Sequence, residues 1–266
     1  MNEEKKMLKR TLVLFAAALA AIGPAQAQRP RPAVPPAELQ RAVTAPGRPS
    51  AATALDEVRR PAEVLRFVGL RRGDRVLDYF TGTGYYAELM ARAVGPQGVV
   101  VGWNGAAFMR NERVRTALDE LRSRNRNTAF YGTPNTAIAF PPESFDFVML
   151  HLVYHDAYWE SAQFGLPRID PNSVVQAIWN ATRPGGTVAV IDHMAAPGGD
   201  TRAVVDAVHR IDPAVVRADF ERAGFVLEAQ SDMLRNRDDN YATNVFDAAI
   251  RGRTDRFVYR FRKPAR

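Results

Sequence analysis

The residues best suited to chemistry in this chain are histidines, because three of the four follow two apolar segments. His151 and His155 lie at the end of the first segment, and His193 ends the second. Asp156 and Asp192 lie beside them. If the two segments are neighbouring parallel strands, these side chains meet at one edge of a sheet. An imidazole titrates near neutral pH, so His155 or His193 could remove a proton from a substrate hydroxyl or amine. We therefore assign His155, Asp156 and His193 as the candidate catalytic residues.

The same cluster is also compatible with a metal ion. His151 and His155 are four residues apart and could share an ion with Asp156 or His193, since imidazole and carboxylate groups suit zinc or iron. Unlike the H-E-x-x-H pattern, the segment has no glutamate between its histidines, and spacing alone does not fix ligand geometry. We assign no metal ligand and keep a metal-assisted hydrolase or lyase as an alternative function.

A second informative stretch is Arg75–Tyr86, which reads RVLDYFTGTGYY. Its apolar start predicts a buried strand that Asp78 closes, and Gly82-Thr83-Gly84 predicts a tight turn. Apolar residues then recur at helical spacing, at Tyr86, Leu89, Met90 and Ala93. Glycine lets a backbone approach a ligand closely, and a helix start offers unpaired N–H groups. A strand, a glycine turn and a helix start in this order predict a nucleotide-type pocket, with Asp78 at its edge.

This stretch resembles the first motif of the class I S-adenosylmethionine (SAM)-dependent methyltransferases, which reads roughly V-L-D-x-G-x-G-x-G. Residues 76–84 match it, with Phe80 in the place of the first glycine. The resemblance continues in order through Phe145–Leu150, Arg183–Thr187 and Ala223–Phe225, and covers about Leu55–Lys263. It implies that the protein is a SAM-dependent methyltransferase with SAM as its cofactor, and we expect a small-molecule substrate.

The resemblance also implies which residues contact the cofactor: Asp78, Phe80, Gly82, Gly84, Asn104, Thr133 and His151. Asn104 follows the second predicted strand, where the family has an acidic residue that binds the ribose hydroxyls. Thr133 stands at the next acidic position of the family. The family's backbone contact to the adenine falls near His151.

Strand and helix patterns alternate along the chain, which is typical of a mostly parallel sheet with helices on both faces. The predicted strands are Arg75–Tyr79, Val99–Trp103, Thr128–Tyr131, Phe147–Leu150, Thr187–Asp192, Phe225–Ala229 and Phe257–Phe261. The predicted helices lie near Leu55–Val68, Tyr85–Val94, Ala106–Ser123, Pro171–Thr182 and Pro213–Ala223. The predicted fold class is α/β, a Rossmann-like seven-stranded sheet. Its order, 3-2-1-4-5-7-6 with the seventh strand antiparallel, is implied by the resemblance.

Several connections could also contribute to the site. The polar groups His209–Asp212 and Leu234–Asp239 lie on the side where substrates enter the resembled fold, although each is equally typical of a solvated loop. The connection Asp232–Thr254 has no apolar period, and long ordered loops often line sites. Arg183–Gly186 has the composition of a turn. The aromatic residues that could stack on a ligand, or else belong to the core, are Trp103, Trp159 and Tyr154.

The first residues have the pattern of a secretory signal peptide. Basic residues precede an uncharged apolar run, Thr11–Ile22, and Ala25-Gln26-Ala27 follows as a cleavage site. The run is short for a membrane span. We therefore expect cleavage after Ala27, a periplasmic or secreted protein, and no stable membrane insertion after cleavage. Residues 28–52 are rich in proline and predict an extended, mobile tether, so that the folded domain occupies residues 53–266.

Composition limits the classes of partner. The 266 residues are enough for one α/β domain, and without any cysteine the fold depends on its core alone. The formal charge of +7 falls to +5 when the leader's four basic and two acidic residues are removed. The arginine-rich stretch 110–126 is typical of a solvated helix face, and without interleaved aromatic residues it predicts no nucleic-acid partner. A non-catalytic binding protein on the same fold is the second alternative.

Overall fold

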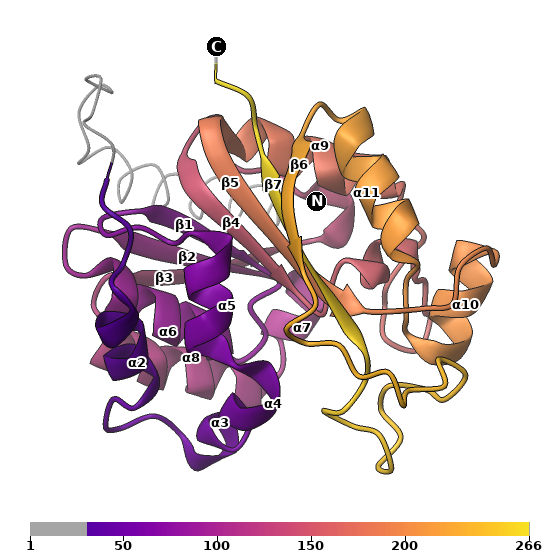
Figure 1. Cartoon of the computed structure of the whole chain (residues 1–266), viewed down its shortest axis with the longest axis horizontal. Coiled ribbons are helices and arrows are strands. Elements are labelled where there is room, and N and C mark those ends of the chain that lie inside the picture. Colours follow the sequence, from indigo (N-terminus) through magenta and orange to yellow (C-terminus); the bar gives the residue numbers. More distant parts are fainter. Residues whose placement is uncertain (1–30, 266) are drawn as a thin grey trace, which may run out of the picture. The chain divides into compact units, whose positions relative to one another are not determined.

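In the computed structural model, which describes residues 31–265, seven strands form one sheet (Figure 1). The strands are β1 (Arg75–Tyr79), β2 (Val99–Gly105), β3 (Thr128–Thr133), β4 (Phe145–His151), β5 (Thr182–His193), β6 (Val226–Ser231) and β7 (Arg256–Arg262). Their order is β3-β2-β1-β4-β5-β7-β6, and β7 pairs antiparallel with both β5 and β6. The predicted sheet order and fold class are confirmed.

The register of the central strands brings their carboxyl ends together. Tyr79 of β1 pairs with Trp103 of β2 and with Leu150 of β4. One residue further along, His151 of β4 pairs with Ile191 of β5. Residues that follow these four strands therefore lie at one edge of the sheet, where open α/β sheets bind ligands.

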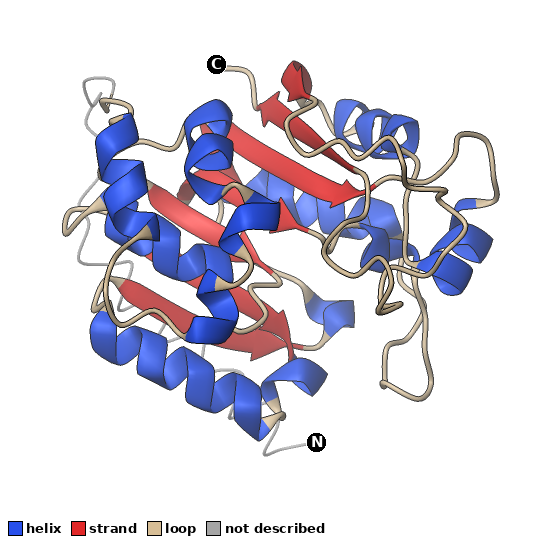
Figure 2. Ribbon diagram, turned by 60° about the horizontal axis from the view of Figure 1, so that its bottom comes forward, coloured by secondary structure: helices blue, strands red, loops and turns tan. Residues whose placement is uncertain are grey.

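Helices cover both faces of the sheet, as Figure 2 shows. One face carries α2 (Pro36–Val43), α5 (Pro61–Val68), α6 (Tyr85–Val94) and α8 (Glu112–Arg124). Side chains of α5 and α6 form a core with alternate residues of the strands, among them Val76, Met149 and Ile191. The other face carries α9 (Pro171–Ala181) and α11 (Pro213–Arg222), where Phe220 stacks on Phe261 of β7. The central strands are apolar on both faces because both are covered.

The remaining helical segments of the described residues are short, and most lie in connections near the carboxyl edge. They are α3 (Ser50–Thr53), α4 (Asp56–Arg59), α7 (Ala106–Met109), η1 (Asn135–Ala137), η2 (His155–Tyr158) and α10 (Thr201–Val208). Of these, α10 was not predicted. Its N-cap, Asp200, accepts a hydrogen bond from the backbone N–H of Ala203 at 2.8 Å, which satisfies one amide of the first turn.

The predicted tether at residues 28–52 is wrong from Pro32 onward, because the chain from that residue belongs to the same compact unit as the sheet. Instead of extended chain, α2 packs against α5 and α6. Leu39 and Val43 of this helix are buried. Pro36 occupies the first turn, where its missing N–H breaks no intrahelical bond, so a proline-rich composition is compatible with a helix start. The predicted leader, residues 1–27, lies outside the described residues.

Two predicted helices are each divided into two. Arg60 takes a left-handed conformation, φ 45°, between α4 and α5. Pro61 cannot donate to the helix that precedes it, and it disfavours the helical conformation for Arg60, so a new helix starts there. Between α7 and α8, Asn111 caps the second helix by accepting a hydrogen bond from the N–H of Arg113 at 3.0 Å.

The predicted turn at Arg183–Gly186 is a loop within β5. Phe145 and Phe147 of β4 pair with Thr182 and Thr187 of β5. The paired positions are therefore two residues apart in β4 but five residues apart in β5. The extra residues leave the pairing with β4, although Gly185 and Gly186 keep backbone hydrogen bonds to Lys263. Gly185 takes a positive φ of 74° within them. β5 is therefore longer than predicted.

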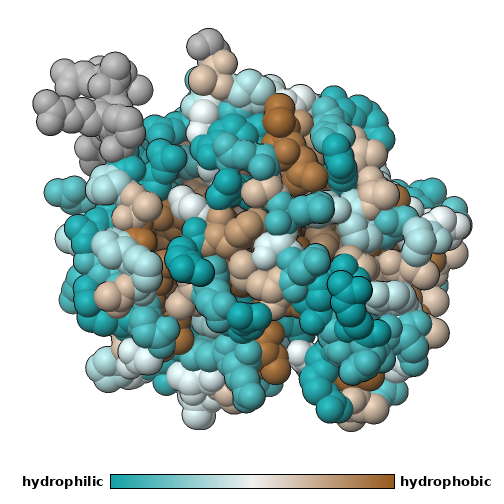
Figure 3. Space-filling view, viewed as in Figure 1, coloured by the Kyte–Doolittle hydropathy of each residue, from teal (hydrophilic) through white to brown (hydrophobic). Residues whose placement is uncertain are grey.

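The surface of the described residues is mainly hydrophilic on the face that Figure 3 shows, with scattered apolar side chains. Large apolar side chains that are exposed in this part of the chain are Phe108, Phe164, Val226 and Phe246. Within residues 31–265, no helix combines the length and apolar character that crossing a bilayer requires.

Candidate functional site

The glycine turn after β1 is built from residues with positive φ. Phe80, Gly82 and Gly84 have φ values of 54°, 61° and 91°. The hydroxyl of Thr81 donates to Asp78 Oδ2 at 2.5 Å and ties the turn to the end of the strand. For Phe80 this conformation is unfavourable, and strain of this kind is commonly held at ligand sites.

The two glycines of the turn face different surroundings. A Cβ atom on Gly82 would point into open space. A Cβ atom on Gly84 would overlap Leu121 of α8 and crowd Leu118. Gly82 is therefore the glycine that a ligand can approach, whereas Gly84 is required for the packing of α6 against α8.

Asn104 holds the glycine turn through both ends of its side-chain amide. Its Oδ1 accepts from the N–H of Gly82 at 2.9 Å, and its Nδ2 donates to the carbonyl of Gly82 at 3.0 Å. An amide can accept and donate at once, whereas a carboxylate could not donate to the carbonyl. Thr133, the other residue predicted to replace an acid, accepts from Trp103 Nε1 at 3.0 Å. Both side chains are thus engaged within the protein, and neither is directed to a ligand in this structure.

Three polar side chains, those of Arg59, Tyr86 and His151, gather near this turn. Tyr86 Oη and His151 Nε2 are buried without a hydrogen-bond partner, and their rings are 4.6 Å apart. The Arg59 guanidinium lies 4.3 Å from the ring centre of Tyr85 and interacts electrostatically with Asp78 and Tyr86. Buried polar atoms without partners are rare, so these point to a ligand. Arg59 lies in the short helix α4, before the first motif, so no motif in the sequence indicated it.

Asp78 is buried, and burial raises the pKa of its carboxyl to about 7. The Thr81 hydroxyl, the Ala87 N–H and the positive charge of Arg59 oppose this shift. A cationic group of a ligand placed beside Asp78 would favour its charged form. Asp78 therefore offers a carboxyl for a ligand cation, and Arg59 of α4 offers a guanidinium for a ligand anion.

The second part of the site is organised by Asp192, which is fully buried at the end of β5. Its carboxylate accepts from the backbone N–H groups of His155, at 2.9 Å, and His193, at 2.8 Å, and it lies 2.8 Å from His155 Nδ1. His155 Nε2 lies 3.3 Å from Asp156 Oδ1, so carboxylates face both ring nitrogens. Burial lowers the pKa of His155, but Asp192 and Asp156 together raise it to about 9.

His193 has different surroundings. Its Nδ1 lies 2.7 Å from the hydroxyl of Thr254, and Nε2 makes no hydrogen bond to any described residue. Burial holds the pKa of His193 well below its usual range, and the positive charges of His155 and nearby arginines act in the same direction. The ring is neutral at physiological pH and presents one unengaged nitrogen.

His209 completes the cluster and was not among the predicted site residues. It follows α10 in a left-handed conformation, φ 51°, and its ring centre lies 5.7 Å from that of His155. The rings of Trp159 and Phe246 flank it at 4.6 and 5.0 Å. The sequence singled out the polar group His209–Asp212, but a loop gives no periodic signal of what it faces. The structure brings His155, Asp156 and His193 together with His209, and places His151 apart, against Tyr86.

The connection after β6 fixes the segment that carries His209. Arg210 is fully buried and pairs with both carboxylate oxygens of Asp239 at 2.8 and 3.0 Å. Asp239 also accepts from the N–H of Asp255, at the other end of the connection. The two polar groups noted in the sequence therefore form one buried ion pair rather than two solvated loops. This connection is the gold loop below α10 in Figure 1.

Two tyrosines anchor the segment that carries His155. The hydroxyls of Tyr154 and Tyr158 both donate to Asp219 of α11, at 2.7 and 2.5 Å. Tyr154 precedes η2 and Tyr158 is its last residue, so the short helix is held at both ends. Tyr154 is buried and belongs to the core rather than to a stacking surface.

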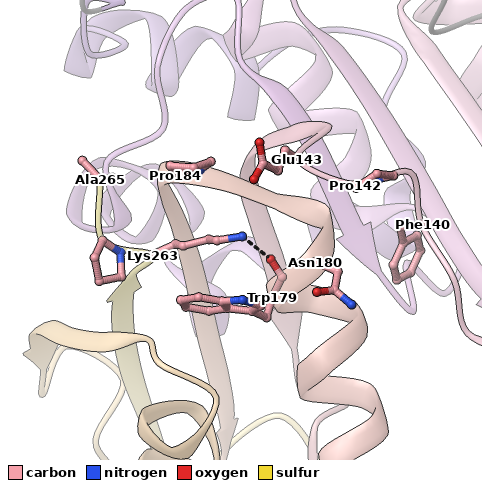
Figure 4. A pocket seen from close by; sticks show the side chains of 9 residues that line it. Phe140, Pro142, Glu143, Trp179, Asn180, Pro184, Lys263 and Ala265 are labelled. Carbon is pink, nitrogen blue, oxygen red and sulfur yellow. Dashed lines mark hydrogen bonds between the residues drawn. The ribbon is translucent and has the colours of Figure 1, made fainter.

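A separate open cleft lies at the opposite, amino edge of the central strands (Figure 4). Its lining includes Glu143 before β4, Pro184 in the loop within β5, and Lys263 after β7. Lys263 Nζ donates to the carbonyls of Trp179 and Thr182 at 2.8 Å, so its positive charge binds the C-terminal end of α9. The cleft contains none of the predicted site residues, and we assign it no role.

Comparisons with known proteins match the chain to methyltransferases. The family model for protein-L-isoaspartate(D-aspartate) O-methyltransferase matches residues 50–127, which include the glycine turn and β2. The ubiquinone/menaquinone biosynthesis C-methyltransferase UbiE of Serratia proteamaculans is 29% identical over 127 residues, 47% of this chain and 44% of that protein. The 23S rRNA uracil C5-methyltransferase RlmD of Psychrobacter arcticus is 30% identical over 161 residues, 59% and 28% of the two chains. The chain thus spans less than half the length of these relatives.

Solved structures share the fold. A SAM-dependent methyltransferase from Aquifex aeolicus aligns with a TM-score of 0.54 and 16% identity, over 86% of this chain and 98% of that one. The arsenic(III) SAM methyltransferase from Chlamydomonas reinhardtii gives 0.52 and 16%, over 86% and 74%. The motif, the sheet order and these matches agree. The chain has the fold of the SAM-dependent methyltransferases and is similar to methyltransferases in the segment that holds its first motif. The methyltransferase fold accounts for the glycine turn at β1, and the histidine cluster lies beyond it at β4 and β5.

Proposed function

We propose that this protein is a SAM-dependent methyltransferase that acts on a small molecule. The observation that carries the proposal is the group of unused polar atoms beside the glycine turn. Tyr86 Oη and His151 Nε2 are buried without hydrogen-bond partners. Arg59 interacts electrostatically with Tyr86 and with Asp78, a carboxyl whose pKa is raised by burial. A protein that had kept only the fold would have no reason to retain such groups.

These residues fit the parts of SAM. Arg59 would bind the carboxylate of the methionine moiety, and Asp78 its ammonium group. The open side of Gly82 would admit the ribose, with Asn104 holding the turn in place. SAM, when bound, supplies a methyl group activated by the sulfonium. The task left to the protein is to position the acceptor in line and remove one proton.

His193 is the best candidate for the base. Both ring nitrogens of His155 face carboxylates, whereas His193 is held at Nδ1 by Thr254 and keeps Nε2 unengaged. A base held by one nitrogen and open at the other is the arrangement that general-base catalysis requires. Asp192 fixes the backbone of both histidines and acts as a positioning residue.

The enclosure of the cluster supports a small acceptor. His155, His193 and His209 are each less than 9% exposed, and Trp159 and Phe246 flank the last of them. A folded macromolecule could not bring a flat surface to these nitrogens without displacing the connection after β6. The names of the relatives, which include C-methyltransferases of a quinone pathway and of RNA, point to no single acceptor.

The test is SAM binding by calorimetry with three glycine variants. Gly82→Val should weaken binding by more than about 100-fold, roughly 2.7 kcal/mol, because its side chain enters the ligand's space. Gly185→Val is the matched control, since Gly185 also has a positive φ and open space but lies in the loop within β5. It should keep wild-type affinity.

Gly84→Val should instead lower thermal stability, because it collides with Leu121. A wild-type protein that does not bind SAM, or a Gly82→Val protein that binds as tightly as wild type, would exclude this pocket.

A further inference from the structure

Three residues from two separate segments converge beside the sheet edge. His155 and Asp156 begin η2, and His209 follows α10. Each offers one ligand atom, and these atoms all lie within 4.8 Å of one another. We propose that His155, Asp156 and His209 bind one divalent first-row transition-metal ion, with zinc as the preferred ion. The site does not depend on SAM and goes beyond the proposed function.

The distances suit one shared ion. Two ligands about 2.1 Å from a zinc ion at a tetrahedral angle are about 3.4 Å apart. His155 Nε2 lies 3.3 Å from Asp156 Oδ1, and His209 Nδ1 lies 3.9 Å from the same oxygen. Both separations are close to that value.

His209 Nδ1 gives independent evidence for a ligand. This nitrogen is buried and has no hydrogen-bond partner among the described residues. The His209 side chain is 9% exposed, and the rings of Trp159 and Phe246 flank it. Leaving a buried polar atom unsatisfied costs free energy, and an ion at its lone pair removes that cost.

Asp192 supplies the support that metal-bound histidines need. It is fully buried and lies 2.8 Å from His155 Nδ1. A carboxylate on one ring nitrogen fixes the tautomer and directs the lone pair of the other nitrogen to the metal. In His155 that other nitrogen, Nε2, is the one that faces Asp156.

Charge and ligand type select the ion. Within residues 31–265, no arginine or lysine forms an ion pair with Asp156 or Asp192. Two imidazoles and one carboxylate suit zinc or iron, whereas magnesium and calcium prefer oxygen ligands alone. The Asp156 side chain is 31% exposed, so the coordination sphere is open on one side. Three protein ligands with an open position are typical of sites that exchange a water or a substrate oxygen.

The ligand set differs from the one considered from spacing. His151 lies against Tyr86, and His193 bonds to Thr254, so neither is part of it. His209, which is far from the others in sequence, takes their place. The site carries no implication of hydrolase or lyase chemistry.

The first experiment is a cobalt titration of tag-free protein after treatment with EDTA and dialysis. Co²⁺ should bind at one ion per chain and give visible absorption bands of a four- or five-coordinate site. One equivalent of Zn²⁺ should abolish these bands. A wild-type protein that gives no stoichiometric cobalt spectrum and binds no zinc in competition with a chelator would overturn the proposal.

The second experiment measures zinc affinity in variants, with folding checked by circular dichroism. His209→Ala and Asp156→Asn should weaken zinc binding by at least about 100-fold, and Asp192→Asn by about 10–100-fold. His151→Ala is the matched control and should bind zinc as tightly as wild type. Asp156→Asn is isosteric at a partly exposed position, so it keeps the test decisive if His209→Ala does not fold.

Equal zinc affinity in wild type and Asp156→Asn, or an equal loss in His151→Ala, would contradict this ligand set. SAM binding, measured without metal, separates the two proposals: protein that binds SAM but no zinc overturns the metal site alone.

Discussion

For single residues, the position in the motif does not determine what the side chain contacts in the structure. Asn104 occupies the place of an acid, yet its amide holds Gly82 at both the N–H and the carbonyl. Gly84 belongs to the same motif as Gly82, but it makes room for Leu121 rather than for a ligand. The motif therefore identified the right segment. Which of its residues can contact a ligand and which serve packing follows from where each side chain points in the structure.

Removal of the proposed base should affect turnover and leave cofactor binding intact. His193→Ala should lower the rate of methyl transfer by about 10²–10⁴-fold, since general-base help typically contributes that much. The rate is measured as incorporation of radiolabelled methyl from SAM into a small-molecule extract of the native host. SAM affinity, measured in parallel, should stay at the wild-type value because the glycine turn is untouched. A His193→Ala protein with an unchanged rate would exclude this residue as the base.

Asp78 should make stability depend on pH in the absence of ligand. Its pKa rises from 3.8 to about 7 on folding because the carboxyl is buried. The folded state then binds more protons than the unfolded state between these values, so stability falls as the pH rises from about 4 to about 7. The loss should approach about 4 kcal/mol above pH 7. Asp78→Asn cannot ionise and should lack this dependence.

The measurement is urea unfolding of both proteins from pH 4 to pH 8, with the difference between them taken at each pH. Taking the difference removes the contribution of the other carboxyl groups. A constant difference across this range would show that Asp78 is not buried as the structure has it.

At the scale of elements, side chains from neighbouring segments fix the positions of the histidines. η2 carries His155 and is held at both ends by tyrosines on Asp219. His209 precedes Arg210, whose guanidinium is buried on Asp239. Short segments with few apolar contacts need such ties, because on their own they would open at little cost.

Breaking the Arg210–Asp239 pair should therefore destabilise the domain. Asp239→Asn leaves a buried guanidinium without its counter-charge, which typically costs about 3–5 kcal/mol. Glu221→Gln is the matched control, because the Arg217–Glu221 pair is exposed and should contribute less than about 1 kcal/mol. The free energy of unfolding in urea checks both. A loss no larger than that of the control would mean that the pair does not support the fold.

At the scale of the whole molecule, we propose that the protein is exported. The basic, apolar and A-x-A order of the first 27 residues is the motivation. Protein from the native host should begin at Gln28 in N-terminal sequencing and fractionate with periplasmic or secreted proteins. Recovery in the cytosol with Met1 retained would contradict export.

Much of the fold could be predicted from the sequence, because periodic apolar patterns report on local structure. The bounds of β1 and α6 agree with prediction, and the other strands differ only at their ends. Turn chemistry placed the loop at Arg183–Gly186, although its location within a strand depended on pairing with β4. α2 was not predicted, because the proline-rich composition of residues 28–52 indicated extended chain and the apolar face of the helix, Leu39, Ala42 and Val43, is short.

Residue patterns along the chain were sufficient to predict the alternation of strands and helices, the glycine turn, and the meeting of His155 with His193 at one sheet edge. These follow from residue spacing along neighbouring segments. Three further contacts depend on how the chain folds: His209 joins these histidines, Asn104 bonds to Gly82, and Arg59 interacts electrostatically with Asp78. Each of these contacts joins residues from segments whose approach depends on the path of the chain, and no local period encodes that path.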